Sequence, residues 1–216
     1  MNLKTTRRTV LLASFVGAGA LLLWASKGFV KPTAKPAASY PAHDYHSDEK
    51  VTVAADPYDL AEKAQIFTIH WSENGYLPIF LVITNDGDQP ITLMDMQAQF
   101  ITARRDKIQA ASYDDLYRRL AHISGGGTNP LPLPIPKKPK GAVNKKMQDE
   151  IDEAMFSAKA VEPHSTQSGF LFFDVSGISA PEPGAHLYIT GIRNAKGTEL
   201  MYFEIPLEKY LSASTN

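Results

Sequence analysis

The sequence YLPIFLVIT, residues Tyr76–Thr84, contains an unbroken apolar run from Ile79 to Ile83. A continuous apolar run of this length is typical of a central strand that is covered on both faces. Turn residues follow at positions 85–88 (NDGD), and Asn, Asp and Gly tolerate a positive φ. Because a second long strand is expected over Ile91–Ala103, the sequence predicts a hairpin whose register this tight turn sets.

Strand patterns continue on both sides of the hairpin. In Ile66–Trp71, three apolar residues alternate with three others, which is the period of a half-buried strand. Three further apolar segments are separated by Gly, Pro and Asn: Gly169–Val175, Ala185–Arg193 and Glu199–Pro206. About seven short strands at this spacing predict a mainly β domain over residues 51–211, built as a two-sheet antiparallel sandwich.

A helical insertion is expected at residues 112–160, within this domain. Ser112 begins a capping box in which Asp115 replaces the usual Glu, and one apolar helical face follows: Tyr113, Leu116, Tyr117 and Leu120. On the other face we expect i,i+4 ion pairs that join Asp114 to Arg118 and Asp115 to Arg119. A second helix is expected over Asn144–Ala160, with one side formed by Met147, Ile151, Ala154, Met155 and Ala158.

A glycine- and proline-rich stretch, SGGGTNPLPLPIPKKPKG at Ser124–Gly141, connects the two helices. Glycine ends a helix readily, and alternate prolines favour extended polyproline geometry. We interpret residues 128–139 as a rigid, solvated strut. The alternative is a ligand segment for a partner with an aromatic-lined groove. The sequence GGGTNP lacks the lysine and hydroxyl ending of a phosphate-binding loop.

Residues 1–27 have the pattern of an export signal, since Lys4, Arg7 and Arg8 precede the uncharged run Val10–Ala25. A spanning helix needs roughly 17–25 residues, so this run suits either a signal-anchor or a cleaved signal peptide. Trp24 and the lack of a small-residue cleavage site favour the anchor, with the body facing the periplasm or exterior. Cleavage would make the protein secreted. The segment 6–11 also resembles a twin-arginine signal, although an ordinary basic n-region has the same composition.

Residues 28–50 carry Pro32, Pro36 and Pro41 among Ala, Ser and Lys. This composition predicts a semi-extended Pro/Ala-rich linker. Such a linker would hold the domain roughly 50–70 Å from the membrane.

The bulk composition excludes several classes of protein. The chain has 216 residues, with 22 basic residues against 23 acidic ones. Four of the basic residues lie in residues 1–27, so the remainder carries a charge of about −5 and is a poor candidate for nucleic-acid binding. Cysteine is absent, which excludes disulfides, thiolate metal sites, a cysteine nucleophile and a lipidated N-terminal cysteine.

No catalytic, cofactor-binding or metal-ligating residue is predicted. There is no GxSxG motif, and none of the six histidines lies in an HExxH motif: His43, His46, His70, His122, His164 and His186. His43 and His46 are three apart, but a flexible linker is a poor preorganised metal site. Asp86 and Asp88 lack the other ligands of a calcium loop.

Two more segments have a structural and a functional interpretation. Met94 and Met96 would share a strand face with Ala98 and Phe100, and methionine there is more often core filling than a copper ligand. Residues 104–107 (RRDK) end a strand, where charges discourage edge pairing. A patch for an anion or a lipid headgroup is the alternative for these charges.

Four segments together resemble bacterial extracytoplasmic immunoglobulin-like modules of unknown function: LPIFLVITNDGDQPITL (77–93), SGFLFFDV (168–175), HLYITGIR (186–193) and LMYFEIPL (200–207). The resemblance covers residues 51–211. It implies a non-catalytic, membrane-tethered interaction module with an unidentified envelope protein as partner. The alternative is an exported enzyme, or a carrier of a small ligand or metal.

Overall fold

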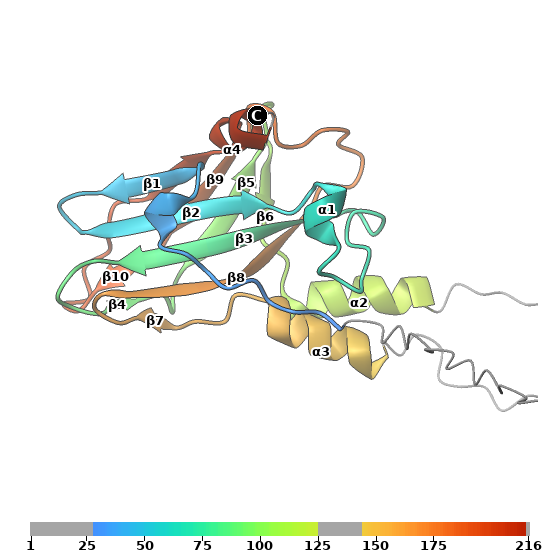
Figure 1. Ribbon diagram of the computed structural model, residues 1–216, viewed down its shortest axis with the longest axis horizontal. Coiled ribbons are helices and arrows are strands. Elements are labelled where there is room, and N and C mark those ends of the chain that lie inside the picture. Colours follow the sequence, from blue (N-terminus) through green and yellow to red (C-terminus); the bar gives the residue numbers. More distant parts are fainter. Residues whose placement is uncertain (1–27, 125–143, 215–216) are drawn as a thin grey trace, which may run out of the picture.

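The computed structural model describes residues 28–124 and 144–214. Expectations for residues 1–27, and for the glycine- and proline-rich stretch beyond Ser124, lie outside the described residues. The fold is mainly β, as expected, and all its sheets are antiparallel (Figure 1). Among the described residues, no helix has both the length and the apolar composition that crossing a bilayer requires.

Two four-stranded sheets and one small sheet form the body. In spatial order, sheet 1 contains β1 (His43–His46), β2 (Val51–Pro57), β3 (Tyr76–Asn85) and β8 (Ser165–Asp174). Sheet 2 contains β11 (Phe203–Pro206), β9 (His186–Thr190), β5 (Gln97–Ile101) and β6 (Lys107–Gln109). The small sheet contains β10 (Arg193–Asn194), β4 (Ile91–Thr92) and β7 (Ala160–Val161). The helices are η1 (Ala37–Ser39), α1 (Ala61–Ala64), α2 (Tyr113–Ser124), α3 (Lys145–Ala154) and α4 (Glu208–Ser214).

Strand β3 is the centre of the fold, and all ten of its residues are buried. It pairs with β2 along one edge and with β8 along the other. Ile79, Leu81 and Ile83 belong to a hydrophobic cluster shared by sheets 1 and 2, whereas Phe80 and Val82 belong to a second cluster on the outer face of sheet 1. The prediction of a central strand covered on both faces is therefore confirmed.

The outer face of sheet 1 is covered by helices and by irregular segments. Leu116 of α2 and Ile151 of α3 are fully buried there, beside Phe170 and Phe172 of β8. In Figure 1 both helices lie at the end of the sheet where β8 finishes. Each large apolar side chain buried in this way contributes about 1.5–3 kcal/mol to stability.

The predicted hairpin is wrong. After the turn at residues 85–88 the chain enters β4, which pairs with β7 and β10, and then continues into β5 of the opposite sheet. Both edges of β3 are already occupied by β2 and β8, so the next strand has no place beside it.

The predicted strand at Ile66–Trp71 is also wrong, although its burial alternates as expected. Phe67, Ile69 and Trp71 are buried in the outer cluster, and the residues between them are partly or fully exposed. The backbone makes local turns, with the N–H of Phe67 donating to Ala64 and that of Trp71 donating to Ile69. Alternating burial therefore arises here without a neighbouring strand.

Residues 28–50 do not extend away as a linker. Phe29 is buried and stacks on Phe67, with ring centroids 5.4 Å apart. The N–H of the fully buried Ala37 donates to Thr84 Oγ1 at 2.8 Å. Strand β1 pairs with β2 along its whole length. Small residues in this segment lie close against sheet 1, so the expected spacing from the membrane does not come from it.

The capping box of α2 is confirmed, because Ser112 Oγ accepts the N–H of Asp115 while Asp115 accepts the N–H of Ser112. The expected i,i+4 ion pairs are wrong. Arg118 pairs with Asp115 at 2.6 Å, and Arg119 reaches Asp174 at the end of β8 at 2.5 Å.

Helix α3 begins after an Asn144 cap and ends at Ala154, six residues earlier than expected. Beyond it the chain pairs with β8, where the N–H of Phe156 donates to Phe170 O. Gly169 permits this approach, since a Cβ there would lie 2.5 Å from Phe156 Cα. The helix therefore ends because its next residues join the edge of the sheet.

Both flanks of the two-sheet stack are closed. On one flank, Asp44 of β1 accepts the N–H of Glu204 of β11 at 3.0 Å. On the other, residues after β6 pair with β8, and the N–H of Ala111 donates to Phe172 O at 2.8 Å. Strands β1 and β8 are therefore each tied to the opposite sheet.

Candidate functional site

A cleft of about 280 Å³ lies where β2 ends, β3 begins and β8 passes into the loop at residues 176–184. Its lining includes the rings of Tyr58 and Tyr76, the hydroxyl of Ser176, the carboxylates of Asp59 and Glu182, and apolar residues such as Pro181. No lysine or arginine is among the described residues that line it. We call this space the Glu182 cleft.

Glu182 is the most unusual residue in this lining, because only 7% of it is exposed. Within the described chain its carboxylate accepts a hydrogen bond only from its own backbone N–H. Burial raises the pKa of this carboxyl above its usual value, and the nearby Asp59 raises it further. Buried carboxylates normally have hydrogen-bonding or charged partners, so this group has unused capacity to accept hydrogen bonds.

The loop that carries Glu182 has a constrained backbone. Ala180 adopts a φ of 118°, a region that residues with a side chain avoid. Such a conformation costs about 1–3 kcal/mol and persists only where the surroundings impose it. The backbone carbonyl of Glu182 accepts the N–H of Ala185, which fixes the start of β9 next to the loop.

Lys63 lies next to the cleft, but its ammonium group is already fully engaged. It lies 2.5 Å from Asp56 Oδ1, donates to Pro57 O at 2.7 Å, and sits 4.6 Å above the rings of both Tyr58 and Tyr210. Burial raises the pKa of Asp56 in spite of this lysine. Lys63 therefore does not neutralise the cleft carboxylates.

Asp59 lines the cleft, and Arg119 lies behind two of its lining residues, Tyr76 and Ser176. The hydroxyl of Tyr210 donates to Asp59 Oδ1 at 2.6 Å. Arg119 bonds to Asp174 and to Ser176 Oγ, and its guanidinium lies 5.6 Å from the centre of the Tyr76 ring. Lys63 and Arg119 are thus each paired with another carboxylate, Asp56 and Asp174. Among the described residues, neither Asp59 nor Glu182 has a basic partner.

Of the two histidines at residues 43 and 46, His46 contacts a strand of the opposite sheet, whereas His43 Nδ1 lies 2.6 Å from Tyr40 O. His46 stacks on Phe203 of β11 with ring centroids 4.0 Å apart, and its Nδ1 lies 2.8 Å from Glu49 Oε2. Glu49 and Asp44 in turn accept backbone N–H groups from Met201 and Glu204. The described residues contain no group of three or more side chains suited to a metal. His46 and Asp44 instead dock β1 on β11.

Asp86 and Asp88 lie in a turn that Asn85 organises. Its Oδ1 accepts the N–H of Gly87 at 2.9 Å, and its Nδ2 donates to Gln89 O at 2.8 Å. The exposed Asp88 lies 3.2 Å from His164. The prediction of a turn at residues 85–88 is therefore confirmed, although the strands on its two sides do not pair with each other.

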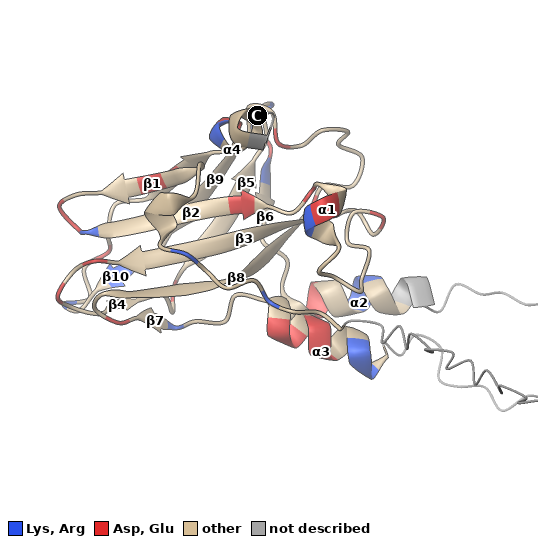
Figure 2. Ribbon diagram, in the orientation of Figure 1, with Lys and Arg blue, Asp and Glu red and all other residues tan. Residues whose placement is uncertain are grey.

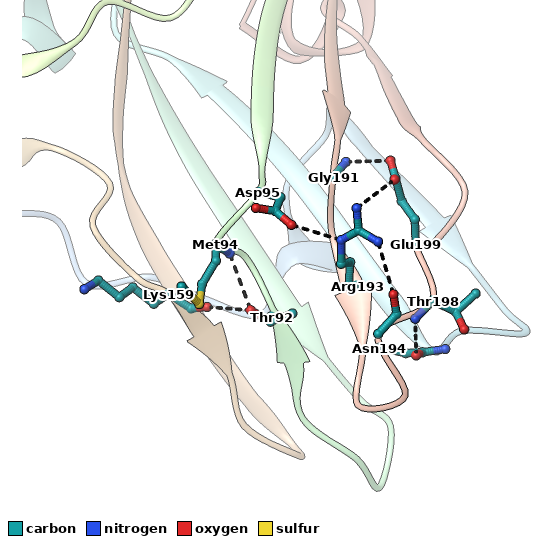
Figure 3. A network of polar contacts seen from close by, with 10 residues as sticks. Thr92, Met94, Asp95, Lys159, Gly191, Arg193, Asn194, Thr198 and Glu199 are labelled. Atoms are coloured by element: carbon teal, nitrogen blue, oxygen red, sulfur yellow. Dashed lines mark hydrogen bonds and ion pairs between the residues drawn. The ribbon is translucent and has the colours of Figure 1, made fainter.

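Met94 and Met96 stand on either side of Asp95 in the sequence, and Asp95 belongs to the polar network in Figure 3. Met94 is 76% exposed, whereas Met96 packs against the inter-sheet cluster. Between them Asp95 binds Arg193 at 3.0 Å, and the same guanidinium lies 3.6 Å from Glu199 Oε2 (Figure 3). The network ties the turn after β10 to the β4–β5 connection, so this region has a structural role.

The charges at residues 104–107 form the turn between β5 and β6. Thr102 Oγ1 accepts the N–H groups of Arg104 and Asp106, and Arg105 takes a φ of 72°. All four charged residues are exposed. They lie beside the edge strand β6, where the solvated interpretation placed them.

In Figure 2 other charges gather on α3, with lysines at its start and acids after them.

No sequence pattern indicated the Glu182 cleft. Glu182 stands in PEPG, which is typical of an exposed turn, and Tyr58 and Asp59 lie between two predicted strands. Their proximity depends on the tertiary fold alone. Comparison of the chain with family models, with curated proteins and with solved structures finds no match.

Proposed function

We propose that the protein is a non-catalytic binding module of the cell envelope. Residues 10–25 tether it to the membrane, and the body faces the periplasm or exterior. Three observations support this proposal: the order of the strands, the position of Phe29, and the contacts of the carboxyls whose pKa values are shifted.

The strand order supports an immunoglobulin-like fold. In chain order β2, β3, β5, β6, β8, β9 and β11 take the places of strands A, B, C, C′, E, F and G. Strand β1 is an addition beside A, and the helices α2 and α3 occupy the C′–E connection. Sandwiches of this kind present loops at their ends, where binding residues commonly lie.

The position of Phe29 supports a body that is held close to the membrane. Residues 26–28 alone separate it from the end of the apolar run at Ala25. Phe29 stacks on Phe67 and meets the edge of Phe170, whose ring centroid is 6.2 Å away. A membrane helix at residues 10–25 would therefore lead directly into the folded body, which would stand at the bilayer surface.

Most carboxyls with shifted pKa values have structural partners. Burial opposes ionisation of Asp174, but hydrogen bonds to Ser176 and the Arg119 guanidinium bring its pKa below the usual value. Hydrogen bonds from Ser112 lower the pKa of Asp115 in the helix cap. Structural ion pairs and caps shift pKa values without catalysis.

The Glu182 cleft favours a second candidate function, which is that of a carrier of a small ligand.

Labelling of single cysteines tests the tether and its orientation, because the chain has none of its own. Ser47→Cys, in the exposed β1–β2 turn, should react with a membrane-impermeant maleimide in intact cells or spheroplasts. Asn2→Cys should react only after lysis, and both variants should sediment with membranes. Labelling of Ser47→Cys only after lysis, or recovery of the full-length chain in the cytosol, would contradict the proposal.

A further inference from the structure

The Glu182 cleft carries two negative groups and no positive one. Asp59 and Glu182 both line it, while the neighbouring Lys63 and Arg119 are held by Asp56 and Asp174. Only 7% of Glu182 is exposed, and within the described chain its carboxylate accepts only its own N–H, so it retains free acceptor positions toward the cleft. A ligand that carries positive charge would balance the two carboxylates, and its hydrogen-bond donors would fill the free acceptor positions of Glu182.

The aromatic rings of the cleft disfavour a sugar as the ligand. A sugar needs an open ring face, but Lys63 covers one face of Tyr58, and Phe170 packs against the same ring at 4.9 Å. Arg119 lies over Tyr76, and Trp71 meets that ring nearly at right angles. Both rings are thus already engaged. The contacts of Lys63 also show how this part of the molecule holds an ammonium group, between a carboxylate, a carbonyl and tyrosine rings.

We propose that the Glu182 cleft binds one organic cation, an ammonium or guanidinium group, with Glu182 as the buried acceptor and Asp59 as the second carboxylate. The volume of about 280 Å³ suits a group no larger than a lysine or arginine side chain. This assignment deepens the proposed binding function and rests on it. The cation belongs either to a free amine or to a side chain of a protein partner.

The test uses the full chain in an uncharged detergent and titrates it with n-butylamine, ethylguanidinium and the neutral 1-butanol, followed by NMR chemical shifts. We expect both cations to bind and 1-butanol not to bind. Glu182→Gln should weaken cation binding at least about tenfold, because it removes one member of a buried charge pair. Asp59→Asn keeps an acceptor for Tyr210 and should also weaken binding. The matched control Glu162→Gln, outside the cleft, should leave binding within about twofold.

Two results would overturn the assignment. One is binding of 1-butanol as tight as that of butylamine; the other is cation binding that Glu182→Gln and Asp59→Asn both leave unchanged. Either would leave the cysteine-labelling test unaffected, so loss of the cation site and loss of the envelope role are distinguishable. Titration with Gly-Lys-Gly, compared with its norleucine counterpart and with spermidine, assigns the source: tighter binding of the lysine peptide indicates a protein partner, and tighter binding of spermidine a free amine.

Discussion

Glu150 Oε2 accepts the backbone N–H of Thr68 at 2.8 Å, across 82 positions of sequence. The same carboxylate also accepts the hydroxyl of Thr68 and the N–H of Ile69, the latter at 3.1 Å. Glu150 is only 2% exposed, so these three donors replace the water that the charge has lost. One acidic side chain of α3 therefore holds the irregular segment 66–71 against the outer face of sheet 1.

Replacing Glu150 by Gln should destabilise the protein by about 1–3 kcal/mol, because the amide retains one acceptor but loses the charge that strengthens these bonds. The measurement is chemical unfolding of the full chain. Asp152→Asn, on an exposed position of the same helix, is the control and should change stability by less than about 0.5 kcal/mol. Equal stability of both variants would mean that Glu150 does not anchor the segment.

Gly169→Ala should lower stability by about 1–3 kcal/mol, as overpacking in a closely packed region does. A Cβ there would lie 2.5 Å from Phe156 Cα and 2.8 Å from its N, so backbone would have to move. Gly28→Ala is the matched control, since nothing lies within 4 Å of the added methyl group. Thermal unfolding of the two variants makes the comparison.

The two hydrophobic clusters should respond separately to truncation. Leu81→Ala removes apolar volume between the sheets, and Phe80→Ala removes it from the outer face, each at a cost of about 2–5 kcal/mol. Met94→Ala, at a side chain that is 76% exposed, should cost less than about 0.5 kcal/mol. A melting temperature that neither core variant lowers would refute the packing of β3.

Phe29→Ala should release the N-terminal segment from the body while leaving the sheets intact. The stacked pair with Phe67 would be lost, along with burial of about 1.5–3 kcal/mol. Limited proteolysis should then cut residues 28–36 faster than in the parent chain. Val30→Ala, at a residue that is 68% exposed, serves as the control and should leave cleavage unchanged.

The buried Glu182 should make stability depend on pH. Its pKa is higher in the folded protein than in the unfolded chain, so folding weakens ionisation. Below about pH 4 both states carry the proton and nothing is lost; as the pH rises through the unfolded and then the folded pKa, stability falls. Glu182→Gln removes this penalty and should raise Tm at pH 7 but not at pH 3.5. A variant that lowers Tm at both values would show that the carboxylate has a stabilising partner.

Sequence reasoning identified features that local chemistry determines. The unbroken run in β3 implied cover on both faces, and Ser112 with Asp115 gave the start of α2, since both signals lie within a few residues. It failed where the partner is distant. Ala37 is buried against sheet 1, where Thr84 Oγ1 accepts its N–H. No local pattern distinguishes such an alanine from one in a linker. The cleft that Glu182 lines likewise brings together residues 58–59, 72–78 and 175–182, which are far apart in the sequence.

The pairing of strands was unpredictable for the same reason. Burial alternates in Ile66–Trp71 as it would in a strand, but no neighbouring edge is free to receive it. The turn at residues 85–88 permits a hairpin, and the occupied edges of β3 prevent one. Apolar periodicity reports which side chains are buried, whereas the backbone partner depends on which edges remain open.

The contacts that tie the flanks of the two sheets together affect how copies of the protein associate at high concentration. Asp44 occupies the N–H of Glu204, and Ala111 occupies the carbonyl of Phe172, at positions where another chain would otherwise add a strand. At these two positions of the described body, backbone groups that an added strand would use are already occupied. A second copy that approaches either flank therefore meets an occupied backbone group at these positions, which disfavours its addition there as a further strand.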